Sequence, residues 1–63
     1  MGVYKTMIIE DDPFARQMLV DLLGGHAEYS VVGMEDSVQG ALASIPRLEP
    51  DLVFLDMELT DGK

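Results

Sequence analysis

Three short apolar runs, separated by amphipathic stretches, constrain the fold of this chain more than any other feature. The runs lie at residues 5–9, 29–33 and 52–55, and polar or turn-forming residues stop each of them. The first and third are continuously apolar at residues 7–9 and 52–55, which is typical of strands buried on both faces. Strands that alternate with helices predict an α/β fold with a parallel sheet.

The stretch after the first run is predicted to form a helix that begins at Pro13. Asp12 can cap this helix, and Pro13 suits its first position because the missing N–H would have no partner there. The expected buried stripe contains six apolar residues, Phe14, Ala15, Met18, Leu19, Leu22 and Leu23. The face expected to meet water carries Arg16, Gln17 and Asp21. Gly24 and Gly25 are expected to end the helix, because glycine tolerates a left-handed cap.

The stretch after the second run has the most regular helical spacing in the chain. Its apolar residues follow the i, i+3, i+4, i+7 pattern and are Val38, Ala41, Leu42 and Ile45. Residues 35–37 offer capping groups, and Glu35 and Asp36 are the expected caps. Pro46 is expected to stop this helix near Ile45, because a proline ring clashes with the preceding helical turn.

The fully apolar first and third strands favour a sheet in which the first strand is central. The spatial order would then be 2-1-3, the start of a flavodoxin-like sheet. Because crossover connections are right-handed, the two helices would cover opposite faces. The alternative order 1-2-3 would leave the first strand at an edge of the sheet.

Acidic residues follow directly on two of the predicted strands. Glu10, Asp11 and Asp12 follow the first strand, and Asp56 follows the third. Neighbouring strands lie about 4.8 Å apart, and in open α/β sheets ligands bind where the strand order reverses. Crowded carboxylates repel one another, so the arrangement is sensible around a cation. Oxygen-only ligands favour magnesium or manganese.

Such a cation would also bridge to a phosphoryl oxygen and neutralise its developing charge. A carboxylate beside the ion could attack phosphorus and carry the phosphoryl group as an acyl phosphate. Asp56 is the natural nucleophile because it stands alone at its strand end, while the cluster on the first strand would hold the metal. The backbone carbonyl of Glu58 could supply another oxygen ligand. Asp12 is more suited to capping the helix than to binding metal.

The blocks at residues 7–13, 37–42 and 50–59 together resemble the receiver domain of bacterial two-component response regulators. The specific combination is the acidic cluster of the first block with Pro-Asp-Leu-Val-Phe-Leu-Asp in the third. The resemblance covers essentially all of residues 1–63 and implies a flavodoxin-like fold of five strands and five helices. Residues 1–63 would then form the N-terminal half of a receiver domain, truncated after the third strand.

The resemblance also implies a role for each matching residue. Asp56 would be the phosphoacceptor, and Glu10 and Asp11 the acidic pair that binds magnesium, with Asp11 the direct ligand. The main-chain carbonyl of Glu58 would be a further ligand beside Asp56. The phosphoryl donor would be a histidine kinase or a phosphotransfer protein. The domain would be a regulatory phosphoacceptor and not an enzyme, with transcriptional control exerted by an output domain outside this chain.

The sequence departs from the family's pattern in the loop after Asp56 and in its length. Thr60 stands where the family usually has proline, which suggests a less rigid loop. The family's switch Ser/Thr and its lysine fall beyond residue 63, as do its fourth and fifth strands. The third strand, at residues 52–55, is therefore expected to present a bare apolar edge and to self-associate through it.

Composition narrows the classes of partner and compartment. The chain has 4 Lys and Arg against 12 Asp and Glu, a net charge of −8, which disfavours binding of nucleic acid or anionic lipid by this chain. The sequence contains no cysteine, no apolar run of membrane-spanning length and no signal-peptide pattern. A cytoplasmic location without a membrane partner is therefore expected.

Two alternatives remain open at the level of sequence. The segment Asp56-x-Glu58-x-Thr60 resembles the Asp-x-Asp-x-Thr motif of haloacid-dehalogenase-type phosphatases, in which the first acid is the nucleophile. That interpretation leaves Glu10 and Asp11 without a role, and Glu58 stands where the motif has aspartate. The other alternative is a structural fragment without phosphotransfer.

Overall fold

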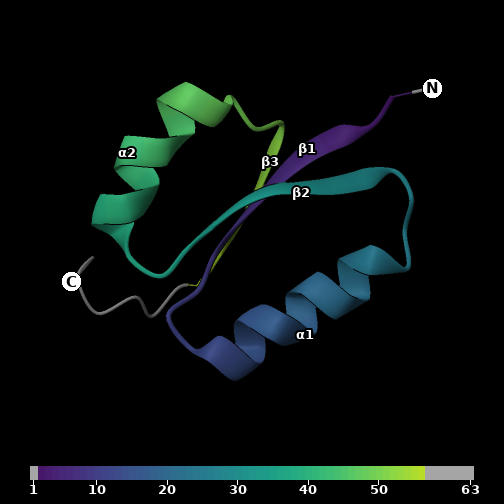
Figure 1. The fold of residues 1–63 in the computed structure, drawn as a ribbon, viewed down its shortest axis with the longest axis horizontal. Helices are drawn as coiled ribbons and strands as arrows, with labels where there is room; N and C mark the ends of the chain where they lie inside the picture. Colours follow the sequence, from purple (N-terminus) through teal and green to yellow (C-terminus); the bar gives the residue numbers. More distant parts are fainter. Residues whose placement is uncertain (1, 57–63) are drawn as a thin grey trace.

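The computed structural model describes residues 2–56 of the 63-residue chain. Strands and helices alternate along these residues, as shown in Figure 1. The elements are β1 (Tyr4–Ile9), α1 (Pro13–Gly24), β2 (Tyr29–Glu35), α2 (Val38–Leu48) and β3 (Leu52–Leu55). The α/β class and all five predicted elements are confirmed, with differences at several element boundaries.

The sheet has β1 in its centre, parallel to both neighbours, in the order β2-β1-β3. This confirms the predicted order 2-1-3, and α1 and α2 lie on opposite sides of the strands in Figure 1. Ile9, the last residue of β1, pairs with Glu35 of β2 and with Leu55 of β3. The three strands therefore end level with one another, which brings the residues that follow β1 and β3 to one edge of the sheet.

The core is built around β1, because a central strand is covered by both helices. Residues 6–9 are all buried. On one face Met7 and Ile9 cluster with Ala41 of α2. Three partly buried residues of α2 pack against this cluster, namely Val38, Ile45 and Leu48. The predicted stripe of α2 is thus confirmed except at Leu42, whose side chain is 67% exposed.

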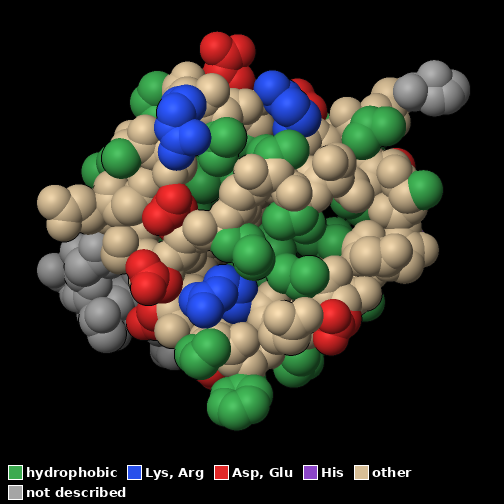
Figure 2. Space-filling view, viewed as in Figure 1, with side chains coloured by type: hydrophobic (Ala, Val, Ile, Leu, Met, Phe, Trp, Pro, Cys, Tyr) green, Lys and Arg blue, Asp and Glu red, His purple; other side chains and the backbone are tan. Residues whose placement is uncertain are grey.

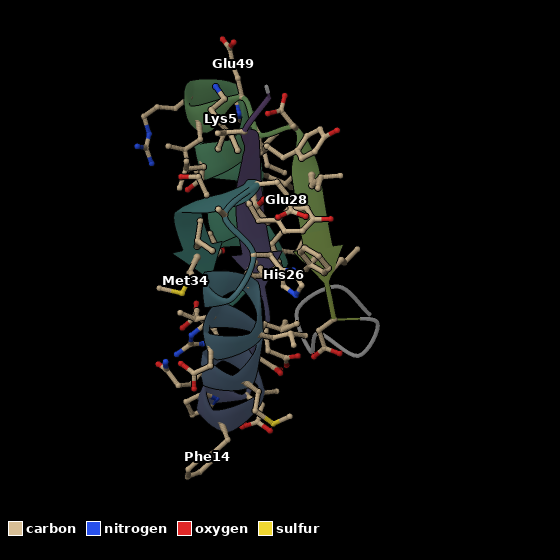
Figure 3. The ribbon with its side chains drawn as sticks, turned by 90° about the vertical axis from the view of Figure 1, so that its right-hand side faces the viewer. Lys5, Phe14, His26, Glu28, Met34 and Glu49 are labelled. Carbon is tan, nitrogen blue, oxygen red and sulfur yellow. The ribbon has the colours of Figure 1, made fainter. Side chains whose placement is uncertain are left out.

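Helix α1 packs against the sheet with only half of the predicted apolar stripe. Phe14, Met18 and Leu22 are 82%, 70% and 64% exposed, and Figure 3 shows Phe14 projecting away from the ribbon. Leu23 is buried, and Ala15 and Leu19 are half-buried. Because both apolar series have i, i+4, i+8 spacing and lie side by side on the helix, spacing alone does not select the one that packs.

Capping follows the prediction at the start of α1 and only in part at its end. The Asp12 side chain accepts a hydrogen bond from the backbone N–H of Phe14 at 3.0 Å, which confirms the predicted cap. The helix ends at Gly24 with Gly25 as its cap, as predicted, but Gly25 has φ −83° and the expected left-handed conformation is wrong. Its N–H instead donates to the Leu22 carbonyl at 3.2 Å within a right-handed turn.

The start of α2 is also capped by a different residue from those expected. The Ser37 hydroxyl accepts from the N–H of Gly40 at 3.0 Å, so Ser37 caps the helix and not Glu35 or Asp36. Glu35 is the last residue of β2, and its carboxylate accepts a hydrogen bond from the hydroxyl of Ser44 in α2. A serine at this position has the short side chain that reaches the first turn.

Helix α2 continues through Pro46 and ends at Leu48, so the predicted stop near Ile45 is wrong. The side chains of Leu42 and Pro46 are both exposed. The Leu42 carbonyl, which a proline at position 46 leaves without its helical donor, therefore lies on the side of the helix that meets water. Glu49, with φ 50°, closes the last turn by donating its N–H to the Ile45 carbonyl at 2.8 Å.

Some apolar side chains are exposed at the surface, and several of them belong to β3. Leu52, Val53 and Leu55 are exposed, Leu55 to 54%, so the described part of the sheet has an apolar edge at β3. Figure 2 shows further hydrophobic side chains in the middle of another face, between the two helices. No helix among the described residues is long and apolar enough to cross a membrane.

Replacing Pro46 by alanine should stabilise the chain, because alanine supplies the N–H that the Leu42 carbonyl lacks and adds no bulk. We expect the Pro46→Ala variant to gain about 1 to 2 kcal/mol in the free energy of unfolding, after allowance for the more flexible unfolded chain. Urea unfolding followed by circular dichroism measures this. Pro13→Ala is the matched control, because position 13 begins α1 and gains no helical hydrogen bond. A lower midpoint for Pro46→Ala would contradict the explanation.

Candidate metal centre

Backbone hydrogen bonds across the sheet fix the residues that follow β1 and β3. The N–H of Glu10 donates to the Glu35 carbonyl at 3.0 Å, and the N–H of Asp56 donates to the Ile9 carbonyl at 2.9 Å. Each bond continues a parallel ladder one residue beyond its strand. Glu10 and Asp56 are therefore held at neighbouring strand ends by main-chain geometry, before any side-chain interaction is considered.

Three carboxylates gather at this edge. One oxygen each of Glu10, Asp11 and Asp56 lies within 4.8 Å of the other two. Glu10 and Asp56 are half-buried, and Asp11 is exposed. Asp12 is turned away to cap α1, while its N–H donates to a carboxylate oxygen of Glu10 at 3.2 Å. The proximity expected from the strand order is thus observed for these three acids, which we call the acidic cluster.

The pKa of Glu10 is raised above the ordinary value for a glutamate. The hydrogen bond from the Asp12 backbone acts to lower this pKa, but it is outweighed by three effects in combination. These are partial loss of solvent, a hydrogen bond with the side chain of Asp56, and the negative charges of Asp56 and Asp11. Full ionisation of the three carboxylates is therefore electrostatically unfavourable. A bound cation would remove this repulsion by supplying positive charge between them.

The donor set fits a small hard cation. All three candidate side chains offer carboxylate oxygens, the ligands that Mg²⁺ prefers. Two oxygens on opposite sides of a bound Mg²⁺ are about 4.2 Å apart, so groups within 4.8 Å of one another need only small side-chain movements to share an ion. Glu58, whose carbonyl was predicted as a further ligand, lies outside the described residues.

Arg16 belongs to this edge of the molecule, although it was predicted to face water. Its Nη1 donates a hydrogen bond to the backbone carbonyl of Glu10 at 2.9 Å, and its side chain is half-buried. The available signal was its position six residues after Glu10, one turn into a helix that starts at Pro13. A side chain there can reach back to the strand end from which the helix departs.

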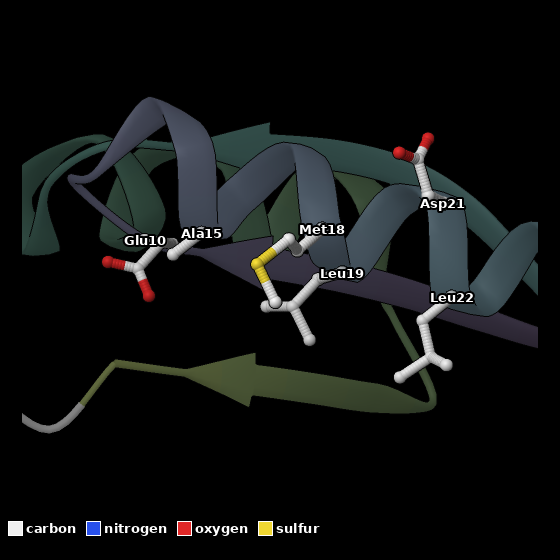
Figure 4. Close-up of a pocket in the computed structure, with 6 residues that line it drawn as sticks. All are labelled: Glu10, Ala15, Met18, Leu19, Asp21 and Leu22. Carbon is white, nitrogen blue, oxygen red and sulfur yellow. The ribbon is translucent and has the colours of Figure 1, made fainter.

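An apolar cavity adjoins the acidic cluster. It has a volume of about 620 Å³ and is lined by Glu10, Ala15, Met18, Leu19, Asp21 and Leu22. Figure 4 shows Glu10 beside Ala15 at the start of α1 and the other lining residues along the helix. The exposed Met18 and Leu22, predicted to lie in the core, thus face an open cavity on the α1 side of the sheet.

A doubly wound α/β sheet with clustered acids at the carboxyl ends of its strands defines a flavodoxin-like class of ligand-binding domain. Within that class, residues 6–63 match the response regulator receiver domain, and the chain belongs to this family of two-component signalling. Receiver domains bind Mg²⁺, interact with histidine kinases and are typically not enzymes themselves.

Two similar proteins are named as transcriptional regulators. The chain is 43% identical over 58 residues to the DNA-binding transcriptional activator DevR/DosR of Mycobacterium tuberculosis, and 34% identical over 63 residues to the transcriptional regulatory protein CitB of Klebsiella pneumoniae. These alignments cover 92% and 100% of this chain but 27% of each relative.

A third relative has a different kind of name. The chain is 38% identical over 55 residues to a protein-glutamate methylesterase/protein-glutamine glutaminase of Syntrophus aciditrophicus. This alignment covers 87% of the chain and 16% of that relative. The chain thus spans about a quarter or less of the length of these relatives. No solved structure matches it significantly.

The raised pKa of Glu10 should respond to Asp56. In a metal-free ¹³C NMR titration we expect the Glu10 carboxyl to titrate above the ordinary range, and Asp56→Asn to lower this pKa, because it removes a negative neighbour. The folded chain binds this proton more tightly than the unfolded chain does. This group therefore makes folding less favourable as the pH rises from its unfolded pKa through its folded pKa. An unchanged Glu10 pKa in Asp56→Asn would contradict the coupling.

Proposed function

We propose that this chain is the phosphoacceptor part of a response regulator, with Asp56 as the residue that receives the phosphoryl group. The observation that carries the proposal is the acidic cluster, in which Asp56 follows β3 and lies beside Glu10 and Asp11. Family membership over residues 6–63 supports it. Residues 1–63 would form the N-terminal part of a receiver domain.

In this proposal the residues of the cluster divide two tasks. Glu10, Asp11, Asp56 and the carbonyl of Glu58 would hold Mg²⁺, which when bound supplies positive charge to the phosphoryl oxygens. A carboxylate oxygen of Asp56 forms a bond to phosphorus, while the bond from phosphorus to the imidazole nitrogen of a donor phosphohistidine breaks. The imidazole leaves with the electron pair, and Asp56 carries an acyl phosphate.

The donor would be a histidine kinase or a phosphotransfer protein, as interaction of the family with histidine kinases suggests. Two relatives are named as a transcriptional activator and a transcriptional regulatory protein, which supports transcriptional control through an output domain of the parent protein. The net charge of −8 supports placing any contact with nucleic acid in that output domain. A cytoplasmic location remains a prediction from the family.

The two alternatives receive less support. A haloacid-dehalogenase-type phosphatase would use Asp56 as nucleophile but would leave Glu10 and Asp11, which lie beside it, without a role. A structural fragment without phosphotransfer would leave the repelling carboxylates at this edge without a function. Labelling of Asp56 separates phosphotransfer from the structural fragment, and turnover of a phosphomonoester separates it from the phosphatase.

The parent protein should become phosphorylated when it is incubated with acetyl phosphate and Mg²⁺, and Asp56→Asn should abolish the labelling, because an amide oxygen is a poor nucleophile towards phosphorus. Asp51→Asn is the matched control. Asp51 precedes β3 and binds the backbone N–H of Lys5 at the opposite edge of the sheet, so labelling should persist in that variant. Phosphate-affinity electrophoresis measures both.

Persistent labelling in Asp56→Asn would place the acceptor elsewhere. Continuous release of phosphate from a phosphomonoester by the parent protein, lost in Asp56→Asn, would support the phosphatase. Absence of labelling with correct folding would support the structural fragment.

We also propose that the 63-residue chain, studied by itself, self-associates through the edge of β3. Unpaired N–H and C=O groups and exposed apolar side chains make such an edge a template for pairing, and Leu52, Val53 and Leu55 are exposed there. Two copies can pair their edges about a two-fold axis, which gives a closed dimer.

A lysine placed on the β3 edge should weaken this association. In sedimentation velocity at micromolar concentration we expect the unmodified chain to be oligomeric and Leu55→Lys to shift it towards monomer, because a charge opposes strand pairing. Leu42→Lys is the control, since Leu42 is also exposed but lies on α2. A monomeric unmodified chain with a cooperative thermal transition would refute the proposal.

A further inference from the structure

The backbone of Glu10 is held on both sides of its Cα atom. Its N–H, which belongs to the peptide group shared with Ile9, donates to the Glu35 carbonyl of β2 at 3.0 Å. The Glu10 carbonyl then leaves the sheet, and it accepts a hydrogen bond from Nη1 of Arg16 in α1 at 2.9 Å. Arg16 thus binds the peptide that links two acids of the cluster.

Rotation about the bond between Cα and the carbonyl carbon of Glu10 would change how the two acids lie relative to each other. Because the N–H of Glu10 is held by β2, this rotation moves the Glu10 carbonyl and Asp11 together, and so shifts the Asp11 carboxylate relative to that of Glu10. Both carboxylates now have an oxygen within 4.8 Å of Asp56. Because they repel one another and Asp56, an unrestrained peptide would turn so as to separate them. The charged hydrogen bond from Arg16 opposes this rotation.

We infer that Arg16 is a positioning residue for the metal centre: its guanidinium fixes the Glu10 carbonyl and thereby keeps Glu10 and Asp11 directed towards Asp56. The inference rests on the proposed function, because it assigns Arg16 a role in binding of Mg²⁺ by the acidic cluster. Arg16 touches neither the ion nor the phosphoryl group, and it acts through the backbone of Glu10.

Removing the charge of Arg16 should change Mg²⁺ affinity in opposite directions for an electrostatic role and for a positioning role. A positive side chain beside a cation site repels the incoming ion, so a purely electrostatic role predicts that removing the charge makes Mg²⁺ bind more tightly. A positioning role predicts weaker binding, because the ligands lose their arrangement. Removal of groups that orient metal ligands commonly weakens metal binding by about tenfold or more.

The experiment compares Mg²⁺ affinity in the 63-residue chain and in three variants. MgCl₂ is titrated at constant ionic strength and neutral pH, and the amide shifts of Glu10, Asp11 and Asp56 are followed by NMR. Arg16→Met should weaken Mg²⁺ binding by about tenfold and shift the Glu10 and Asp11 amides before any metal is added. Arg16→Lys, which keeps a charged donor, should restore part of the affinity.

Arg47→Met is the matched control for the loss of a positive charge. Arg47 lies near the end of α2, where its side chain contacts Ser44, and Mg²⁺ affinity should be unchanged or slightly higher in this variant. Urea unfolding of each variant separates a change in affinity from a change in the folded fraction. If Arg16→Met unfolds, Arg16→Lys keeps the inference testable, because its Mg²⁺ affinity should lie below that of the unmodified chain; equal or higher affinity would overturn the positioning role.

The outcomes separate the inference from the function on which it rests. Unchanged or tighter Mg²⁺ binding in folded Arg16→Met, with wild-type binding intact, would overturn the positioning role and leave the proposed function standing. Equal loss of affinity in Arg16→Lys and Arg16→Met would also overturn it. Failure of the wild-type chain to bind Mg²⁺ at all would overturn the metal site in this chain and the inference together, while phosphorylation of Asp56 in the parent protein would still be tested by labelling.

Discussion

The parallel ladder between β1 and β3 is the constraint on which the rest of this structure depends. Ile9 pairs with Leu55, and its carbonyl accepts the N–H of Asp56, so the residues after both strands are delivered to the same place. The backbone pairing brings together acids that repel one another, so no attraction between their side chains is required. This is possible because the ladder is stabilised elsewhere, in the interior of the sheet.

Burial of β1 supplies that stabilisation. Met7 and Ile8 are fully buried and Ile9 nearly so, and full burial of each such side chain contributes about 1.5 to 3 kcal/mol. The acidic cluster lies at the rim of this core, where its exposed and half-buried carboxylates remain in contact with water. Solvent therefore screens the repulsion, whereas the apolar residues a few positions earlier gain the full benefit of leaving water.

Helix α2 is tied to the same edge through Glu35. The Glu35 carboxylate accepts from the buried Ser44 hydroxyl, while its backbone carbonyl accepts from Glu10. Gly40 lies against this carboxylate, and a side chain at position 40 would collide with it. The polar end of β2 is therefore anchored to α2 on one side and to Glu10 on the other, so that α2, β2 and the acidic cluster form one connected arrangement.

The strands and their order could be predicted because they depend on local composition. A short apolar run such as residues 52–55 favours a strand, although three of its four residues are exposed in the described part of the chain. The continuous burial of residues 6–9 fits the central place of β1. The choice of face on α1 could not be predicted in this way. Leu22 and Leu23 are adjacent and equally apolar, and only the tilt of the helix against the sheet decides which of them is buried.

The remaining differences between prediction and structure arise where tertiary contacts override the local preference of a residue type. Pro46 breaks a hydrogen bond, but on the solvent side of α2, where water replaces the donor. Glu35 has the residue type of a helix cap, yet strand pairing with Ile9 continues through it, and Ser37 caps the helix instead. Arg16 has the residue type of a solvated face, but the Glu10 carbonyl beyond the ladder needs a donor that only a long side chain supplies.

The distribution of the few positive charges completes the account of the acidic edge. In the described part of the chain, Lys5 donates its Nζ to the Leu48 carbonyl at the end of α2, where the helix dipole favours a cation. Arg47 lies in the same last turn.

Arg16 is the basic residue of residues 2–56 that contacts the acidic edge, and it is bound to a neutral carbonyl. The N-terminus of α1 adds partial positive charge just after Asp12. Arg16 and the N-terminus of α1 moderate the repulsion among Glu10, Asp11 and Asp56 without neutralising it, whereas Lys5 lies at the opposite edge of the sheet. The negative charge that remains would favour binding of a divalent cation at that edge of the sheet.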